Sequence, residues 1–456
     1  MARTDSVTST EPEDPSALGP APLLLMLGAA DGSQLAALAG DLSSGLAAGR
    51  ELPHAATVRG LPRGPELLAV TAADKFRLSR TLREFAQGGS PANTALGRRE
   101  AEPRRNAVWC FSGHGGQWPG MGRELLLSAP VFSETVDEID ALVFAEAGFG
   151  VRRILIDGDP TQFERIDRIQ PVTFAYQVAL ARWMLAAGMR PGAVLGHSVG
   201  EVAAAHISGM LALPDAVRVI CLRSRLLARS SGERGAMVSV ALPAEEVARC
   251  IAPAEGRLSV AVHAGPAETV VAGDADDVDQ LILELEPVGV RCRRVRIDAA
   301  SHSHLVDGVL EELRHGTADI RIERPHIPWV STVVPGPDGE SGAPADAEYW
   351  VRNLRGPVRL LQAVTDLARD GHRTFLEIGP HGLLISSVRD TLAALGIRDA
   401  RLLGTCRRQT SERLSVLKAV GALLASGVAM DLPAATRLGR TYGVQADAHP
   451  GASATS

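Results

Sequence analysis

The pentapeptide Gly196-His197-Ser198-Val199-Gly200 places a serine between two glycines, after an apolar run and before a helical pattern. In a G-x-S-x-G turn the glycines let the chain reverse tightly, and the strained serine points its hydroxyl outward. The free N–H groups of the following helix then face any oxyanion that forms beside the serine. A plain Gly-Ser turn has the same letters, but the strand–turn–helix context favours a nucleophile at Ser198.

A nucleophilic serine needs a base, because a free hydroxyl attacks poorly near neutral pH. The chain has 12 histidines. His302 lies where a predicted strand leaves one unit and re-enters another, a position that often lines a cleft. On spacing alone His206, His304 and His381 are equally suitable, so the residue pattern leaves the base open.

A glycine-rich loop, Gly113-His114-Gly115-Gly116-Gln117, follows the apolar strand expected at residues 107–111. Such a loop brings main-chain N–H groups to an anion or oxyanion. It lacks both GxGxxG and the lysine of phosphate-binding loops. An oxyanion-binding loop and a bare surface turn are therefore the two interpretations.

The helix expected at residues 215–230 carries Arg218, Arg223, Arg225 and Arg229. Most arginines on such a helix are solvated or pair with surface acids. One that turns inward toward the nucleophile would bind a carboxylate through two parallel hydrogen bonds.

The composition narrows the class of protein. The 456 residues include 47 basic and 53 acidic side chains, a formal net charge of −6, which argues against a nucleic-acid partner. Five widely spaced cysteines without a CxxC pair argue against a disulfide framework and a thiolate metal site. The polar N-terminus and short apolar runs predict neither a signal peptide nor a membrane span. We expect a soluble, cytoplasmic protein without a metal.

Strands alternate with helices along most of the chain, which predicts an α/β fold with a mostly parallel sheet. Residues 236–297 instead follow the order β-α-β-β-α-β of a ferredoxin-like unit. A single long helix is expected at residues 349–370. The remaining expectations are disordered tails at 1–20 and 433–456, a small α+β unit at 22–90, and a patternless linker at 91–106.

Together these motifs resemble the acyltransferase domain of type I polyketide synthases, which is related to malonyl-CoA:acyl carrier protein transacylases. The matching segments are FSGHGGQWPGMGREL, GHSVGEVAAAH, CLRSRLL, GPAETVVAGD, DAASHS, EYWVRNLRGPVR and FLEIGPHGLL, in family order and spacing. The resemblance implies either a free-standing acyltransferase or a piece excised from a longer synthase.

The resemblance also implies a domain plan. The acyltransferase domain would occupy residues 107–400. Its α/β-hydrolase-like large subdomain would take 107–235 and 298–400, and a ferredoxin-like small subdomain would be inserted at 236–297. The α+β unit at 22–90 would be the preceding linker domain, and 401–432 the linker that follows.

Catalytic roles follow from the same resemblance. Ser198 would carry the acyl group as an ester, with His302 as general base and then general acid. The backbone carbonyl of Asn353 would orient that histidine. The oxyanion hole would use the main-chain N–H groups of His114 and Val199.

The resemblance assigns the substrate contacts as well. Arg223 would pair with the free carboxylate of a malonyl-type unit, while Gln117 and His197 would flank the acyl pocket. The substrate would be a coenzyme A thioester and the partner a phosphopantetheine-bearing acyl carrier protein, with a polyketide synthase module as a further partner. No cofactor is implied.

The sequence does not determine which acyl unit the enzyme selects. Malonyl-selective family members read His-Ala-Phe-His up to the catalytic histidine and methylmalonyl-selective ones Tyr-Ala-Ser-His, where this chain has Ala299-Ala300-Ser301-His302. Ser301 in place of a bulky Phe leaves room for an α-substituent, and Ala299 removes a further large side chain. Val199 is more typical of malonyl selectivity. One methyl group changes binding by only about 1–3 kcal/mol, so malonyl, methylmalonyl and larger units remain candidates. The alanine at Ala264, where the family has asparagine, has no interpretation.

Two other functions are weighed against this one. An α/β-hydrolase-type esterase or thioesterase would use the same elbow and needs an acid between Ser198 and His302 in chain order. The candidates are Asp274, Asp276, Asp277 and Asp279. A non-catalytic docking scaffold is the third possibility, and the intact Ser198, His302 and Arg223 set argues against it.

Overall fold

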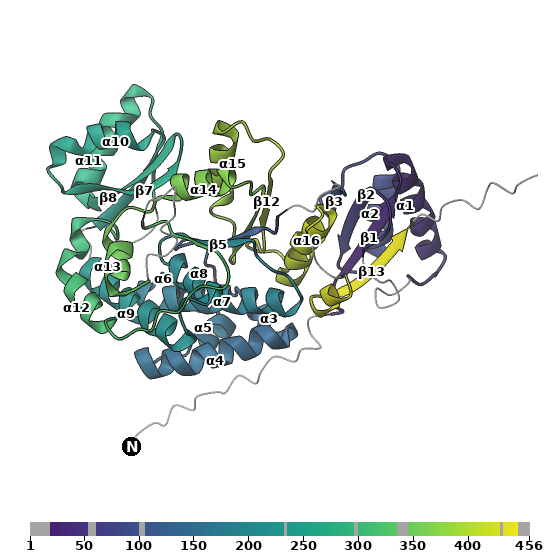
Figure 1. Ribbon diagram of the computed structural model, residues 1–456, viewed down its shortest axis with the longest axis horizontal. Helices are drawn as coiled ribbons and strands as arrows, with labels where there is room; N and C mark the ends of the chain where they lie inside the picture. Colours follow the sequence, from purple (N-terminus) through teal and green to yellow (C-terminus); the bar gives the residue numbers. More distant parts are fainter. Residues whose placement is uncertain are drawn as a thin grey trace, which may run out of the picture.

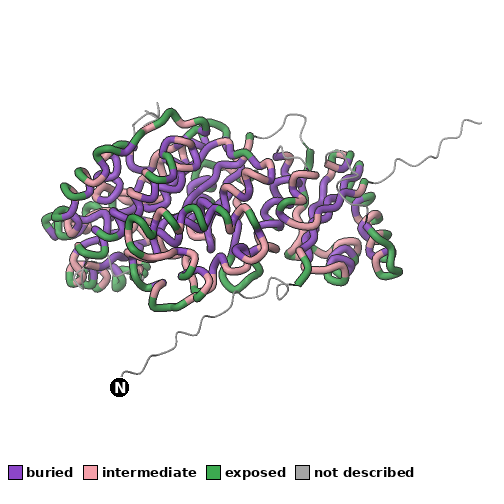
Figure 2. The backbone as a smooth tube through the Cα atoms, turned by 90° about the horizontal axis from the view of Figure 1, so that it is seen from below, coloured by how far each residue is buried: buried purple, intermediate pink, exposed green. Residues whose placement is uncertain are grey.

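The computed structural model shows three units, each built on its own β-sheet (Figure 1). Buried segments run through the middle of the molecule, and exposed ones lie at its periphery (Figure 2). Among the helices of the described residues, none is long and apolar enough to cross a membrane. The structure describes residues 19–52, 61–99, 105–231, 235–295, 300–334, 345–428 and 432–445.

The large subdomain contains a five-stranded sheet in the order β10-β5-β4-β11-β12, and every pairing in it is parallel. All residues of β4 and β5 are buried, as expected for central strands covered on both faces. The predicted α/β fold with a parallel sheet is confirmed. The strands are β4 (Val108–Phe111), β5 (Ala193–Gly196), β10 (Trp329–Val330), β11 (Thr374–Ile378) and β12 (Arg401–Gly404).

Helices enclose this sheet, and α7 is buried along most of its length because it packs against α4, α8 and α9. They are α3 (Arg123–Ser128), α4 (Pro130–Ala147), α5 (Val151–Asp157), α6 (Pro160–Glu164), α7 (Ile166–Ala186), α8 (Gly200–Ser208), α9 (Leu213–Ser231), η5 (His304–Val309), α12 (Leu310–Gly316), α13 (Ala347–Arg355), α14 (Leu360–Arg369) and α15 (Ile385–Ala394).

The single helix predicted for residues 349–370 is wrong, since the chain breaks between α13 and α14. Pro357 has no N–H to donate and disfavours a helical residue before it. Gly356 is accordingly extended, with φ −81° and ψ 165°. Val358 then forms a parallel bridge to Val262 of the small subdomain.

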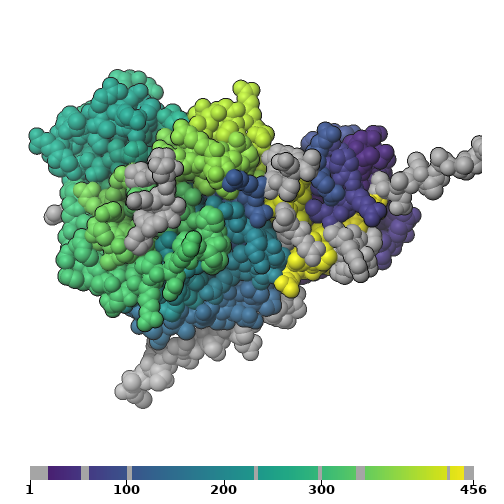
Figure 3. Space-filling model, viewed as in Figure 1, coloured from purple at the N-terminus to yellow at the C-terminus, as the bar shows by residue number. Residues whose placement is uncertain are grey.

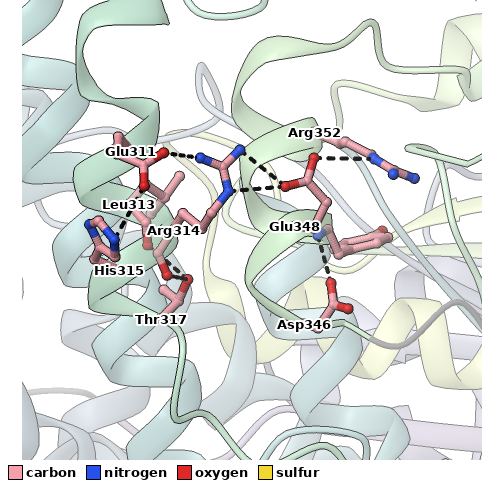
Figure 4. A network of polar contacts seen from close by, with 9 residues as sticks. Glu311, Leu313, Arg314, His315, Thr317, Asp346, Glu348 and Arg352 are labelled. Atoms are coloured by element: carbon pink, nitrogen blue, oxygen red, sulfur yellow. Dashed lines mark hydrogen bonds and ion pairs between the residues drawn. The ribbon is translucent and has the colours of Figure 1, made fainter.

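A polar network holds the outer face of α13 against α12 (Figure 4). The Arg314 guanidinium donates to Glu348 Oε2 from Nε at 3.2 Å and from Nη2 at 3.1 Å. It also pairs with Glu311, and Asp346 caps the start of α13. These contacts fix the helix whose inner face carries Asn353.

The small subdomain is an antiparallel sheet in the order β7-β8-β6-β9, which is the ferredoxin-like arrangement. Val238, Val240 and Val271 on one face pack under its helices, and Met237 and Ala272 lie on the other. The elements are β6 (Gly235–Val240), α10 (Ala244–Ile251), η3 (Ala252–Ala254), β7 (Leu258–Gly265), β8 (Glu268–Asp274), α11 (Ala275–Leu285), η4 (Glu286–Val288) and β9 (Cys292–Arg294).

The N-terminal unit has a four-stranded sheet in the order β13-β1-β2-β3, with helices α1 and α2 on the buried side chains of one face. Helix α16 packs on β1, β2 and β3 and also contacts α3, so it joins this unit to the large subdomain. The elements are β1 (Leu23–Ala29), α1 (Gly32–Ala47), β2 (Glu66–Ala72), α2 (Lys75–Ala86), β3 (Thr94–Arg98), α16 (Glu412–Ala425), η6 (Ala434–Arg437) and β13 (Arg440–Gln445).

Three boundary expectations are wrong. Strand β13 lies within the tail expected from residue 433, and it pairs in parallel with β1, whose backbone groups would otherwise be an open edge. Strand β3 lies within the expected linker 91–106 and extends the sheet beside β2. Strand β12 belongs to the large sheet and not to a linker from 401. Residues 446–456 and residues 1–18 of the expected tails lie outside the described residues.

Candidate active site

Ser198 lies in the turn between β5 and α8 with a positive φ of 53°. A Cβ on Gly196 would lie 2.3 Å from the Glu201 Cα, and one on Gly200 would lie 2.1 Å from the Phe111 carbonyl oxygen. No larger residue fits at either position. The glycines therefore let α8 begin directly against β4 and β5, with the serine in the left-handed conformation that the elbow requires.

His302 is the histidine that reaches the serine. Its Nε2 lies 2.8 Å from Ser198 Oγ, and its Nδ1 lies 2.7 Å from the Gly356 carbonyl oxygen. A carbonyl only accepts hydrogen bonds, so Nδ1 carries the proton and Nε2 is free to accept the serine proton. Of the other candidates, His206 Nδ1 lies 2.9 Å from the Leu211 carbonyl oxygen, and His304 Nε2 lies 3.4 Å from Asp274.

The residue that orients His302 is not the one expected. The resemblance implied the carbonyl of Asn353, which lies in α13, whereas the carbonyl that accepts from Nδ1 belongs to Gly356. Because Pro357 ends the helix, the chain after Arg355 is extended and turns this carbonyl toward the histidine. The main-chain N–H of His302 donates to the Leu354 carbonyl at 2.9 Å. This second hydrogen bond also joins the His302 segment to the end of α13.

Asn353 contributes its side chain instead. Its Nδ2 donates to the Ser198 carbonyl at 3.0 Å, and its Oδ1 accepts from Arg223 Nε at 3.0 Å. The amide thus connects the elbow to the arginine. Sequence reasoning placed the correct residue in the site but gave it the wrong role.

Arg223 is fully buried on α9, and its guanidinium faces the nucleophile. Nη2 lies 3.4 Å from Ser198 Oγ, and Nη1 donates to Gln170 Oε1 at 3.1 Å. Burial lowers the pKa of Arg223 to about 10, which still leaves it charged near neutral pH. Among the described residues it has no carboxylate partner. Gln170 was missed; it is one of two glutamines, with Gln177, that the largely apolar helix α7 buries.

The neutral state of the histidines follows from their surroundings. Burial lowers the pKa of His302 to about 3, and the positive charge of Arg223 acts in the same direction. Burial also lowers the pKa values of His197 and His114 to about 4. At neutral pH the site therefore holds one cation, Arg223, among neutral imidazoles.

The glycine-rich loop packs directly on the elbow. A Cβ on Gly113 would lie 2.9 Å from the His197 carbonyl oxygen and 3.5 Å from Ser198 Cβ. In the described part of the chain, the main-chain N–H groups of His114 and Val199 make no hydrogen bond, so both can donate to an oxyanion.

Two side chains brace this loop. Gln117 Oε1 accepts from the Gly115 N–H at 2.7 Å, and its Nε2 lies 2.9 Å from His114 Nε2. Gln117, expected beside the acyl group, is thus engaged within its own loop. Arg408, from the segment after β12, donates to the Gly115 carbonyl. Sequence reasoning missed this contact because it joins residues 293 positions apart.

Three further residues expected around the acyl group, Ser301, Val199 and His197, lie in the described part of the chain. Ser301 is 7% exposed beside His302, and Val199 is buried next to the nucleophile. His197 lies between Gly113 and Ser198. Ala299 lies outside the described residues.

No carboxylate of the described residues is hydrogen-bonded to His302, as a hydrolase triad would require. Among the described residues, His302 Nδ1 bonds a carbonyl and not a carboxylate. Asp277 pairs with Arg257 and Asp279 with Arg294, both within the small subdomain. No group of three or more His, Cys, Asp or Glu residues in the described ranges is placed to hold a metal ion.

The sequence matches the family model "Acyl transferase domain" over residues 108–430. The mycocerosic acid synthase-like polyketide synthase of Mycobacterium tuberculosis is 42% identical over 377 residues, which is 82% of this chain and 17% of that protein. The 5-methyl-1-naphthoate synthase of Streptomyces sahachiroi is 41% identical over 310 residues, 68% of this chain and 17% of that protein. The chain thus spans about 17% of the length of these relatives.

Solved structures agree with the sequence match. The acyltransferase domain from module 8 of the salinomycin polyketide synthase has a TM-score of 0.83 at 32% identity, covering 91% of this chain and 99% of that one. The acyltransferase domain of SpnD, in complex with 2-(pent-4-yn-1-yl)malonyl, has a TM-score of 0.78 at 29% identity, covering 90% and 97%. The chain belongs to the acyltransferase domain family of polyketide synthases, and it is an acyltransferase.

Proposed function

We propose that this acyltransferase moves a malonyl-type unit from coenzyme A, through an ester on Ser198, to the phosphopantetheine thiol of an acyl carrier protein in polyketide biosynthesis. The observation that carries the proposal is the buried charge of Arg223 beside the nucleophile, which has no carboxylate partner within the described ranges. A buried cation is unfavourable unless an anion offsets it. A free carboxylate on the acyl unit is that anion.

In the first half-reaction His302 Nε2 accepts the Ser198 proton while Oγ attacks the thioester carbonyl. The N–H groups of His114 and Val199 stabilise the resulting oxyanion. Collapse breaks the carbon–sulfur bond, and the protonated imidazole gives its proton to the departing coenzyme A thiolate. Ser198 is left as the acyl ester.

The second half-reaction runs the same steps in reverse with a new thiol. His302 accepts the proton of the phosphopantetheine thiol, and the sulfur attacks the Ser198 ester. The imidazole then returns its proton to the Ser198 oxygen, which regenerates the free enzyme. The first half-reaction exchanges a sulfur–carbon bond for an oxygen–carbon bond, the second does the opposite, and each conserves one proton.

The carboxylate also assists the base. It would offset the charge of Arg223, which is one of the causes that lower the pKa of His302. His302 would then be a stronger base when a dicarboxylic unit is bound than when the site is empty. The structure of the SpnD domain in complex with 2-(pent-4-yn-1-yl)malonyl supports an acyl unit of this class. Small Ser301 keeps malonyl and methylmalonyl both open.

Intact-mass spectrometry of the chain mixed with malonyl-CoA tests the proposal. We expect one adduct with the mass of a malonyl group, mapped to Ser198 and discharged by an acyl carrier protein that bears phosphopantetheine. Ser198→Ala should give no adduct, whereas Ser415→Ala, on α16, should behave like the wild type. A stable adduct on Ser198→Ala would refute the mechanism.

A further inference from the structure

A cavity of about 880 Å³ lies between the small subdomain and α15 of the large subdomain. One wall contains the β7–β8 turn at Gly265–Ala267 together with Arg291 and Arg293 of the β9 segment. The opposite wall contains Ser386 and Arg389 of α15. In Figure 3 a notch in the outline separates the teal small subdomain from the yellow-green segment that carries α15. The volume of the cavity is typical of a binding site for a small organic molecule.

The cavity continues the sheet face that packs against Ala300 and Val358, which lie two residues from His302 and Gly356 in the sequence. Side chains two positions apart on a strand share a face, so Ser239 lies on the same face as Met237. Met237 packs against Ala300 and Val358. Arg293 is paired directly with Ser239 and therefore shares this face. Beyond Met237, this face of the small subdomain's sheet carries the polar Ser239 and the basic Arg293.

The cavity also lies at the edge of the large sheet that holds Ser198. The elbow follows the carboxyl end of β5, and α15 follows the carboxyl end of β11, which is parallel to it. Ligands of open α/β sheets bind outside these carboxyl ends. The elbow and the α15 wall of the cavity therefore both follow the carboxyl edge of the same sheet.

Charge inside the cavity is not balanced. Glu268 accepts a hydrogen bond from Ser239 Oγ at 2.7 Å, and Asp390 pairs with Arg389 at 3.2 Å. Within the described ranges Arg291 and Arg293 have no ion-pair partner, although both are exposed and lie side by side on the same face. By contrast Arg294, on the other face of β9, pairs with Asp279 of α11.

We infer that this cavity binds the phosphate-bearing end of the thioester carrier, with Arg291 and Arg293 as the phosphate ligands. The inference rests on the proposed function, in which donor and acceptor both carry a pantetheine arm that ends in phosphate. Two neighbouring guanidinium groups bind phosphate oxygens through paired, charge-assisted hydrogen bonds. The acyl end of the thioester lies at Ser198 and Arg223 of the large subdomain, and its phosphate end is held by the two arginines of the small subdomain.

Three donors that differ only in phosphate test this inference: malonyl-CoA, malonyl-4′-phosphopantetheine and malonyl-pantetheine. The variant is Arg291→Ala/Arg293→Ala, and Arg294→Ala on the opposite face is the matched control. We expect the double variant to raise the KM for malonyl-CoA about tenfold, as for a lost ionic contact of typical strength. The kcat, and the KM for malonyl-pantetheine, should not change. Arg294→Ala should behave like the wild type with every donor.

The pattern across donors identifies the phosphate. A raised KM for malonyl-4′-phosphopantetheine assigns the site to the phosphate shared by coenzyme A and the carrier protein. A raised KM for malonyl-CoA alone assigns it to the nucleotide phosphates. An unchanged KM for both, or an equal rise with malonyl-pantetheine, would overturn the inference. Failure of the wild type to form a Ser198 ester with any donor would instead refute the proposed function.

Discussion

Two fully buried ionisable side chains lie near Ser198, and their surroundings differ. Glu201, three residues after the nucleophile, accepts from Trp329 Nε1 at 3.1 Å, from the Thr332 N–H at 2.7 Å and from Thr332 Oγ1 at 2.6 Å. Arg223 donates only to neutral groups and has no carboxylate partner among the described residues. Both side chains are 0% exposed.

The difference separates a carboxyl group that holds the fold together from a cation that is available to bind a ligand. The hydrogen bonds of Glu201 come from β10 and the segment after it, and they tie α8 to the sheet. Thr332 Oγ1 also lies 2.8 Å from the Gly196 carbonyl, so the same cluster holds the elbow. No carboxylate of the described residues offsets the charge of Arg223, so an anion can bind beside the serine.

The largest effect is expected from Arg223→Met. Losing the cation should reduce kcat/KM for malonyl-CoA by about 10²- to 10³-fold, the usual consequence of removing one member of a buried charge pair. Stability should change by less than about 1 kcal/mol, because the lost hydrogen bonds to Asn353 and Gln170 are offset by removal of an unpaired buried charge. Steady-state kinetics and urea unfolding measure the two quantities. A large loss of stability would contradict the comparison.

The pH dependence of catalysis gives the next largest contrast. Because the pKa of His302 is lowered to about 3, the base is already neutral well below neutral pH. We expect kcat/KM, which reports the free enzyme, to stay within about twofold between pH 5 and 8. A histidine with the ordinary pKa of about 6.5 would lose about 30-fold at pH 5. An acid limb near pH 6.5 would contradict this electrostatic account.

Glu201→Gln should act mainly on stability. An amide has one acceptor oxygen and brings an NH2 group toward the donors of Trp329 and Thr332, so unfolding free energy should fall by about 1–3 kcal/mol. Burial raises the pKa of Glu201 from 4.5 to about 7, so its stabilising contribution is complete below pH 4.5 and is lost as pH rises through 7. The deficit of the variant should therefore be larger at pH 5 than at pH 8. A deficit independent of pH would contradict the raised pKa.

The smallest effect is expected from an exposed cation, Arg408. Its hydrogen bond to the Gly115 carbonyl steadies the loop that supplies the His114 N–H. Arg408→Met should lower kcat about two- to fivefold with an unchanged KM, since one exposed hydrogen bond contributes about 0.5–1 kcal/mol. Arg408→Lys should restore part of the rate, and its neighbour variant Arg407→Met should resemble the wild type. Equal losses in both methionine variants would indicate a general charge effect instead.

Local patterns predicted the elements that carry the chemistry. The G-x-S-x-G letters predicted the strained turn at Ser198, and alternation of strands and helices predicted the parallel sheet. The choice of His302 over other histidines needed the family resemblance, because its contact with Ser198 spans 104 residues. Such contacts depend on tertiary packing, which single-sequence periodicity does not encode.

The errors have the same origin. Pro357 was read within a continuous helix, so the break that exposes the Gly356 carbonyl was missed. The family resemblance had assigned the orienting carbonyl to Asn353. Strand β13 has too few apolar residues to be recognised alone, and it is ordered by pairing with β1. Gln170 and Arg408 become meaningful only once their partners, Arg223 and Gly115, are placed beside them.

A competition between malonyl-CoA and acetyl-CoA tests the central claim, that the charge of Arg223 awaits the carboxylate of the acyl unit. The wild-type chain is mixed with equal amounts of both thioesters, and the Ser198 esters are resolved by intact mass. The account predicts at least about tenfold more malonyl ester than acetyl ester, as one unmatched buried charge implies. Equal amounts, or an excess of the acetyl ester, would contradict it.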